Sequence, residues 1–351
     1  MKMNEISLAF TFAGCFLGAG YVSGQEIFQF FGTFGNKGIL GLCIAILIII
    51  LFGVFLIRLT KATGVKEMDR IVAGDRLPKL NIIIGFIETF FMFGIFVIMT
   101  AGASALINEL LGISPWISSV LFCSLVLCLS FFGTEGMITV FSTFVPVLSV
   151  ALIIMCGSEI FSGKEPVFVY TNTNPLLGGW FVSALIFTAY NIFTSIGIIT
   201  PIADRIEDKK VLRGIALGGI FLLVIALSVL FLTLMNSGAE KTELPVLTVA
   251  NGYGIGMKTA FAILLLGAML GTSLSCTVAV TKFLTLKSPK LKGYFLNTIM
   301  CICAGFFSLL GFGKLISIVY PICGYFGAVA IILIFIRYFK MKKGFYETSE
   351  K

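Results

Sequence analysis

Residues 38–57 read GILGLCIAILIIILFGVFLI, a run without a single charge. About 20 apolar residues are enough for a helix to cross the hydrocarbon core of a bilayer. Comparable uncharged runs recur at Leu110–Thr134, Gly136–Ser158, Gly214–Ala239, Thr259–Thr281 and Leu315–Ile336. In lipid, a segment must satisfy its backbone hydrogen bonds internally, so these runs must be helices. The sequence therefore predicts an all-α, polytopic membrane protein, with residues 1–351 forming a single membrane domain.

Composition narrows the class of protein further. The chain has 351 residues, of which 58% are hydrophobic and only 12% are charged, whereas soluble domains carry about 25% charge. It has no histidine, which excludes imidazole metal sites and Ser-His-Asp triads. The nine cysteines lie in apolar stretches without C-x-x-C spacing, so we expect free, buried thiols. We expect no enzyme, no cofactor, and no metal other than a coupling Na⁺.

Ten spans follow from the hydropathy pattern, at 6–34, 38–58, 80–110, 114–133, 136–161, 177–203, 213–237, 252–282, 293–312 and 315–338. With the N-terminus inside, 20 of the 25 Lys and Arg residues fall in cytoplasmic segments and 5 fall outside. This asymmetry predicts a multi-pass plasma-membrane protein with both termini in the cytoplasm. It also explains the net charge of +8 without a nucleic-acid partner.

Two spans carry signals that oppose a regular helix. Residues 14–26 of the first span read GCFLGAGYVSGQE, where four glycines weaken the helix and let a ligand approach the backbone. Residues 188–201 of the sixth span read TAYNIFTSIGIITP, with polar side chains, a glycine and a proline. Such irregular backbone survives at membrane depth only where it lines a cavity or is buried in protein. We therefore predict a break in both spans.

These breaks fall five spans apart, at the start of each half of the chain. Broken helices at equivalent positions indicate an inverted-repeat transporter. The prediction is a 5+5 repeat, with halves 6–161 and 177–338 and with helices 1 and 6 broken. The alternative is that the glycines serve close helix packing. Their occurrence in two equivalent spans favours the ligand site.

At these residues the chain resembles the LeuT-fold transporters of the amino acid–polyamine–organocation superfamily. More narrowly, Ala13–Glu26 resembles the YkvI-type bacterial membrane proteins, a group regarded as candidate amino acid permeases. The resemblance implies that the unwound stretch Leu17, Gly18, Ala19 and Gly20 cradles the carboxylate of a substrate. Side chains beside the two breaks complete the predicted substrate site: Tyr21, Tyr190, Asn191, Phe193, Thr194 and Ser195. The aromatic residues that flank the breaks, Phe16, Tyr21, Tyr190 and Phe193, are expected to wall the pocket.

The same resemblance implies a sodium site. Thr272 and Ser273 in span eight resemble the Thr-Ser pair that binds sodium in this superfamily. The hydroxyls of that pair would be joined by the carbonyls of Gly14, Leu17 and Met269, a set of oxygens that suits a hard cation. Alternatively, the two hydroxyls bond only to their own helix. Cys15 replaces an Asn that serves a second sodium in related transporters, which argues against a second site of that kind.

Two carboxylates lie inside predicted spans, where an ionisable side chain is costly and is a functional candidate by default. Glu88 is interpreted as a proton carrier, a charge partner or a gate, with an internally paired carboxylate as the alternative. Glu26 follows the break in span one and is interpreted as a proton or gate residue.

These features together predict a secondary active transporter, a permease for a small amino acid-like solute. It would be coupled to Na⁺ or H⁺ and would alternate access around the broken helices. The alternative is a membrane receptor that senses a ligand with a transporter fold. The predicted partners are a small solute and the lipid bilayer. The residues leave open the coupling ion, the solute, the direction of transport and the oligomeric state.

Overall fold

The computed structural model describes residues 3–65, 68–74, 78–130, 133–288 and 290–349. The first span region contains four short elements: α1 (Glu5–Gly14), α2 (Ala19–Val22), α3 (Gln25–Ile27) and the π-helix η1 (Phe28–Gly32). The rest of the first half consists of α4 (Asn36–Thr63), α5 (Met68–Ala73), α6 (Pro78–Leu111), α7 (Pro115–Ser130) and α8 (Gly133–Phe161).

The second half begins with α9 (Trp180–Ile199), the 3₁₀ helix η2 (Thr200–Arg205) and α10 (Asp208–Met235). Two short elements follow, η3 (Ala239–Lys241) and α11 (Pro245–Asn251). The chain then forms α12 (Ile255–Lys287), α13 (Gly293–Phe307), η4 (Ser308–Leu310) and the long α14 (Phe312–Ser349). The all-α prediction is confirmed for the described residues. The short helices α5 and α11 were not predicted.

Seven helices within the described residues are long and apolar enough to cross a membrane. They lie at predicted spans two, three and six to ten. Three shorter apolar helices, Glu5–Gly14, Pro115–Ser130 and Pro146–Phe161, lie at predicted spans one, four and five. Helix α13 shows why the bundle needs lipid around it, because Phe295, Ile302 and Phe306 are each more than half exposed. The chain is a polytopic α-helical membrane protein.

Helices from distant parts of the chain pack against each other. Helix α1 packs against α10, and α9 packs against α4 and α14. Helix α6 packs against α12, and α7 packs against α13. These contacts bury one apolar core, in which residues such as Phe12, Phe187 and Phe261 are almost fully enclosed.

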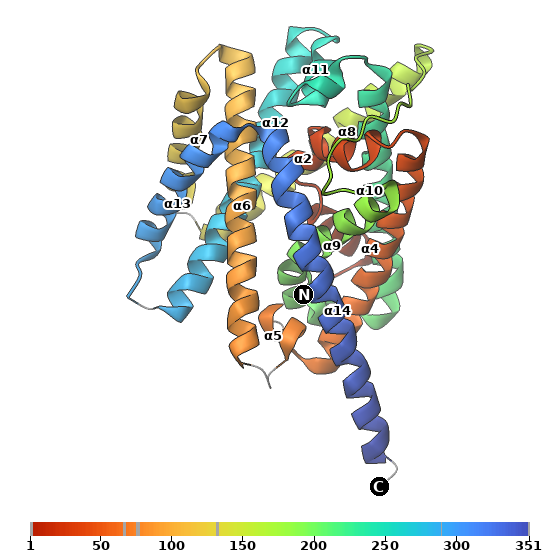
Figure 1. The fold of residues 1–351 in the computed structure, drawn as a ribbon, viewed down its shortest axis with the longest axis vertical. Coiled ribbons are helices and arrows are strands. Elements are labelled where there is room, and N and C mark those ends of the chain that lie inside the picture. Colours follow the sequence, from red (N-terminus) through yellow and green to blue (C-terminus); the bar gives the residue numbers. More distant parts are fainter. Residues whose placement is uncertain (1–2, 66–67, 75–77, 131–132, 289, 350–351) are drawn as a thin grey trace.

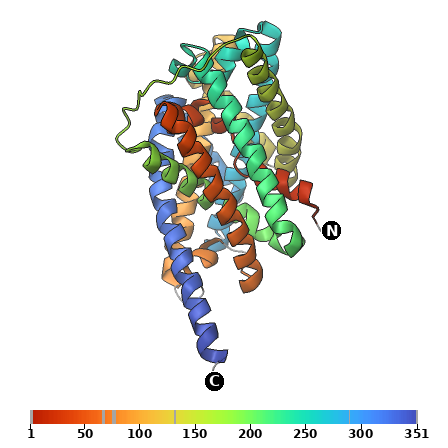
Figure 2. The same ribbon diagram turned by 90° about the vertical axis from the view of Figure 1, so that its right-hand side faces the viewer.

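The two ends of the bundle collect different segments, as Figures 1 and 2 show: α11 lies at one end, and α5 and the C-terminal part of α14 lie at the other. The backbone N–H of Met3 donates to the carbonyl of Arg205 at 2.8 Å. The Arg337 guanidinium donates to the carbonyl of Ile71, also at 2.8 Å. The N-terminus thus meets the link between α9 and α10, and α14 meets α5.

Candidate functional site

Span one is broken where its glycines predicted a break. Helix α1 ends at Gly14, and regular helix resumes only at Ala19. Gly18 between them is extended, with φ −79° and ψ 169°. A second interruption follows at Gly24, whose φ of +90° is in the left-handed region that favours glycine. The π-helix η1 then carries the chain to Gly32, so no part of this span is a long regular helix.

The first break leaves backbone polar groups without partners. Among the described residues, no hydrogen bond ends on the carbonyls of Gly14 or Leu17. The N–H groups of Ala19 and Gly20 likewise donate to no described residue. Backbone groups at membrane depth are costly to leave unpaired. The break therefore presents these unpaired N–H groups and carbonyls, together with the carbonyl of Cys15, to a ligand within a few residues of chain.

A buried carboxyl lies just beyond this break. Glu26 is 4% exposed, and its Oε1 accepts a hydrogen bond from the Tyr190 hydroxyl of α9. Tyr190 stacks on Tyr320 of α14, with ring centroids 4.8 Å apart and an angle of 17° between the planes. A Cβ on Gly20 would stand 2.6 Å from Glu26 Oε2 and 3.4 Å from the Tyr320 hydroxyl. Spans one, six and ten thus meet at one carboxyl group.

Aromatic rings from α9, α2 and η1 enclose this cluster. The Phe187 ring lies 5.6 Å from Tyr190, 5.5 Å from Phe30 and 4.8 Å from Phe31. Tyr21 lies nearby and anchors its hydroxyl on the carbonyl of Leu222, at 2.9 Å. Of the aromatic side chains predicted beside the breaks, Tyr21 and Tyr190 lie here, whereas Phe16 packs against Phe12.

Two amides, Gln25 of α3 and Gln29 of η1, lie against Gly313 of α14, and each has an unsatisfied oxygen. Gln25 Oε1 and Gln29 Oε1 are buried and accept no hydrogen bond from the described residues. Gln29 donates its amide N–H to the carbonyl of Gly313 at 2.8 Å. Buried acceptors without partners are uncommon, so they mark a place where a ligand or water is expected.

The predicted break in span six is wrong, because α9 is a continuous helix from Trp180 to Ile199. The polar side chains bond within this helix: Asn191 to the carbonyl of Phe187, Thr194 to that of Tyr190, and Ser195 to that of Ile192. A single glycine, Gly197, costs a helix only about 1 kcal/mol. The proline stands in the first turn of η2, where it ends the α-helix without interrupting it.

The predicted site residues of span six do not all lie at the Glu26 cluster. Tyr190 joins the Glu26 cluster directly. Phe193 faces α6 instead, where its ring meets that of Phe91 at 5.5 Å. Asn191 and Ser195 are buried, and Thr194 is half-buried. Span six therefore contributes side chains to the cluster, Tyr190 directly and Phe187 around it, and not a second set of exposed backbone groups.

The predicted cation residues of span eight lie on α12, which packs against α2. The Thr272 hydroxyl donates to the carbonyl of Ala268 at 3.0 Å, as in the alternative that involves only the helix itself. Ser273 differs, because its Oγ is fully buried and has no hydrogen-bond partner among the described residues. Met269 is also fully buried on this helix. An orphaned hydroxyl at this position is consistent with the predicted ligand set.

Two proteins of Bacillus subtilis (strain 168) resemble this chain in sequence. The uncharacterized membrane protein YkvI of Bacillus subtilis (strain 168) is 29% identical over 333 residues, which cover 92% of this chain and 93% of that protein. The uncharacterized protein YyaD of the same organism is 22% identical over 324 residues, 89% of this chain and 90% of that protein. No protein-family profile matches the chain.

Three solved transporters share the architecture. A nucleobase-cation-symport-1 family transporter, Mhp1, superposes with a TM-score of 0.64 at 13% identity, covering 95% of this chain and 78% of that one. For the Eremococcus coleocola manganese transporter the TM-score is 0.58 at 15% identity, with 94% and 78% covered. For a Na⁺-coupled sialic acid symporter it is 0.54 at 17% identity, with 88% and 72% covered. The chain has the LeuT fold.

Within this LeuT fold, the second candidate carboxylate lies apart from the first. Glu88 of α6 is half-buried, and its Oε1 would be 3.5 Å from a Cβ on Gly197 of α9. Gly197 and Tyr190 are seven residues apart, which is roughly 10 Å along a helix. Glu88 and Glu26 therefore contact the same helix about two turns apart.

Sequence reasoning missed Tyr320. It is 5% exposed, in the interior of α14, and directly precedes Pro321. A tyrosine in the middle of an apolar span, followed by a proline, was the available signal, since a buried hydroxyl needs a polar neighbour.

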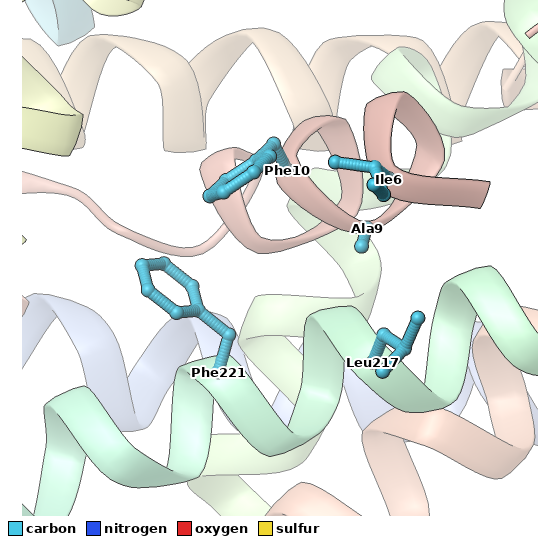
Figure 3. A pocket seen from close by; sticks show the side chains of 5 residues that line it. All are labelled: Ile6, Ala9, Phe10, Leu217 and Phe221. Carbon is cyan, nitrogen blue, oxygen red and sulfur yellow. The ribbon is translucent and has the colours of Figure 1, made fainter. Parts of the chain in front are cut away.

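A pocket on the outside of the bundle gives a useful contrast. Figure 3 shows it between α1 and α10, lined by Ile6, Ala9, Phe10, Leu217 and Phe221. Its lining side chains are all apolar, and Phe10 and Ile6 are more than half exposed. It offers no polar side chain to orient a solute, so the candidate site is the cluster at the span-one break.

Proposed function

We propose that this protein is a secondary active transporter, a permease for a small amino acid-like solute. The single observation that carries the proposal is the span-one break, with its unpaired N–H groups at Ala19 and Gly20 and its unpaired carbonyls at Gly14 and Leu17. An amino acid carries a carboxylate and an ammonium group close together. The two kinds of backbone group match these two charges.

The fold supports this proposal. A manganese transporter, a sialic acid symporter and a nucleobase-cation-symport-1 family transporter share it. The packing of α1 on α10 and of α9 on α4 is what a 5+5 inverted repeat would produce, with halves 6–161 and 177–338. In the proposed mechanism, one set of helices rocks against the other around the break. Both termini would lie on the cytoplasmic side of the plasma membrane.

The substrate site we propose consists of Leu17, Gly18, Ala19, Gly20 and Tyr21 from span one, with Tyr190, Asn191, Phe193, Thr194 and Ser195 from α9. In the structure α9 presents mainly side chains, because its backbone is paired. Recognition of the charged groups would therefore fall to span one. The aromatic rings of Tyr21, Phe187 and Tyr190 would contact the solute's apolar part.

A sodium ion is one candidate for coupling. The proposed ligands are the carbonyls of Gly14, Leu17 and Met269 and the hydroxyls of Thr272 and Ser273. Two observations support this set: the unpaired carbonyls of span one and the orphaned Ser273 hydroxyl. A bound Na⁺ would join α1 to α12 across the break, so ion binding would stabilise one arrangement of the two helices.

The test is uptake of a mixture of ¹⁴C-labelled amino acids into proteoliposomes containing the full-length protein. Uptake is compared with no gradient, with an inward Na⁺ gradient and with an inward H⁺ gradient. Accumulation above protein-free vesicles supports the transporter. If amino acids bind to the purified protein but no gradient drives uptake, the receptor alternative replaces it. The Thr272→Ala/Ser273→Ala variant should lose any Na⁺-driven component and keep any H⁺-driven one.

A further inference from the structure

The carboxyl of Glu26 is packed on both of its oxygens. Oε1 accepts the hydroxyl of Tyr190. Oε2 lies so close to the backbone of Gly20 that a Cβ there would be 2.6 Å away. No ligand atom fits between Oε2 and Gly20 in this arrangement. The negative charge of the carboxylate must therefore be neutralised by a positive ion that occupies almost no space.

No positive charge faces this carboxyl within the described residues. The titratable side chains around it are Tyr21 of α2, Tyr190 of α9 and Tyr320 of α14. Beyond Tyr320 lie two thiols, Cys276 of α12 and Cys323 of α14. Residues 214–235 of α10, which also packs against α3, contain no titratable side chain, and η1 contains none.

A buried carboxylate without a cation is strongly unfavourable in a protein interior, and more so in a membrane. A proton is the one counter-charge that fits between the packed oxygens and their neighbours. We propose that Glu26 is the binding site for a coupling proton and that spans one, six and ten close around it only when it is protonated. This inference rests on the proposed transporter function and names its coupling ion.

The geometry gives the proton a defined role in the cycle. When the break opens to water on the high-proton side, a carboxylate oxygen of Glu26 takes a proton and becomes an O–H group. The neutral carboxyl can then be enclosed between Gly20, Tyr190 and Tyr320. When the site opens on the other side, the same O–H bond breaks and the proton returns to water. Closure without a proton would bury an unpaired charge. The protein is therefore prevented from changing its access side while Glu26 is deprotonated.

The first test separates coupling from transport itself. Glu26→Gln keeps the size and an oxygen that can accept from Tyr190, but it cannot release a proton. We expect it to lose accumulation of the ¹⁴C-labelled amino acid mixture under an inward H⁺ gradient. It should keep exchange between vesicles preloaded with unlabelled amino acids and labelled amino acids outside. Accumulation by Glu26→Gln under the H⁺ gradient would overturn the proposal. The matched control, Glu88→Gln, tests the other intramembrane carboxyl.

The second test needs no solute, so it remains decisive even if the wild type transports nothing. Infrared spectroscopy of the reconstituted protein at neutral pH detects the C=O stretch of a protonated carboxyl. We expect a band that disappears in Glu26→Gln, persists in Glu88→Gln and shifts in Tyr190→Phe. The same spectrum in wild type and Glu26→Gln would overturn the proton site. Absence of uptake and exchange in the wild type would instead refute the transporter function, whatever the spectrum shows.

Discussion

The hydrogen bond between Tyr190 and Glu26 reports the charge of the buried carboxyl. Tyr190→Phe removes one hydroxyl and leaves the ring, so its stack on Tyr320 at 4.8 Å is kept. The loss is then confined to the bond that Tyr190 donates to Glu26 Oε1. Glu26→Gln keeps a hydrogen-bond acceptor at the same place, but this acceptor is always neutral. We therefore compare the loss of stability caused by Tyr190→Phe in the wild type, which has the carboxyl, with the loss in Glu26→Gln, which has the neutral amide.

The magnitudes separate the two states. A bond to a neutral acceptor is worth about 0.5–1.5 kcal/mol, and a bond to a charged group about 1.5–3 kcal/mol. Polar contacts between membrane helices average nearer 0.6 kcal/mol in double-mutant cycles. If Glu26 holds a proton in the closed state, Tyr190→Phe should cost about 1 kcal/mol in both backgrounds. The coupling energy between the two positions should then be close to zero.

The assay is reversible unfolding of the purified protein in mixed micelles by increasing SDS, followed by circular dichroism. Four proteins complete the cycle: wild type, each single variant and the double variant. Tyr320→Phe is the control, because it shares the stack but makes no described hydrogen bond to Glu26. A cost of Tyr190→Phe that is larger by about 1 kcal/mol or more in the wild type than in Glu26→Gln would show a charged carboxylate and refute the reasoning.

Three further substitutions test other parts of the structure. Ser273→Ala should abolish any Na⁺-dependent rise in melting temperature, because the Ser273 hydroxyl has no hydrogen-bond partner among the described residues. Ser275→Ala on the same helix should not, because the Ser275 hydroxyl already donates to a backbone carbonyl. Equal effects of the two substitutions would contradict the sodium site. Phe187→Ala opens a cavity in the aromatic wall and should destabilise by about 3–5 kcal/mol in SDS unfolding, while Phe181→Ala, 47% exposed, should cost much less. Gly218→Ala would place a Cβ 2.6 Å from a carbonyl oxygen of α1. The substitution should therefore lower the free energy of unfolding by about 1–3 kcal/mol and lower the melting temperature. An unchanged melting temperature would show that α1 shifts freely.

The sequence predicted the class of fold and the break in span one because both depend on local chemistry. Uncharged runs such as 38–57 have no stable alternative to a helix in lipid. The glycines at 14, 18 and 20 remove side chains and weaken the helix, and the glycine at 24 allows the left-handed conformation observed there. In each case the residues involved are enough to determine the backbone.

Span six shows where such reasoning fails. Its Asn, Thr and Ser residues were interpreted as groups turned towards a ligand, yet each can bond to a carbonyl three or four residues back in its own helix. The same residue types therefore occur in broken and in intact helices, and tertiary packing determines which of the two forms. Tyr320 was missed for a related reason: its importance comes from its contact with Tyr190, which is 130 residues away in the chain.

Spans one and six thus contribute unlike parts to one site. Span one supplies unpaired backbone groups and the Glu26 carboxyl, whereas the intact α9 supplies the Tyr190 hydroxyl. An intact helix can move as a rigid rod, while a broken one can bend at its unpaired residues. If access alternates in this protein, the bending should therefore be concentrated between Cys15 and Gly24. The proton that we place on Glu26, just beyond that segment, would then determine when the bend can close against α9 and α14.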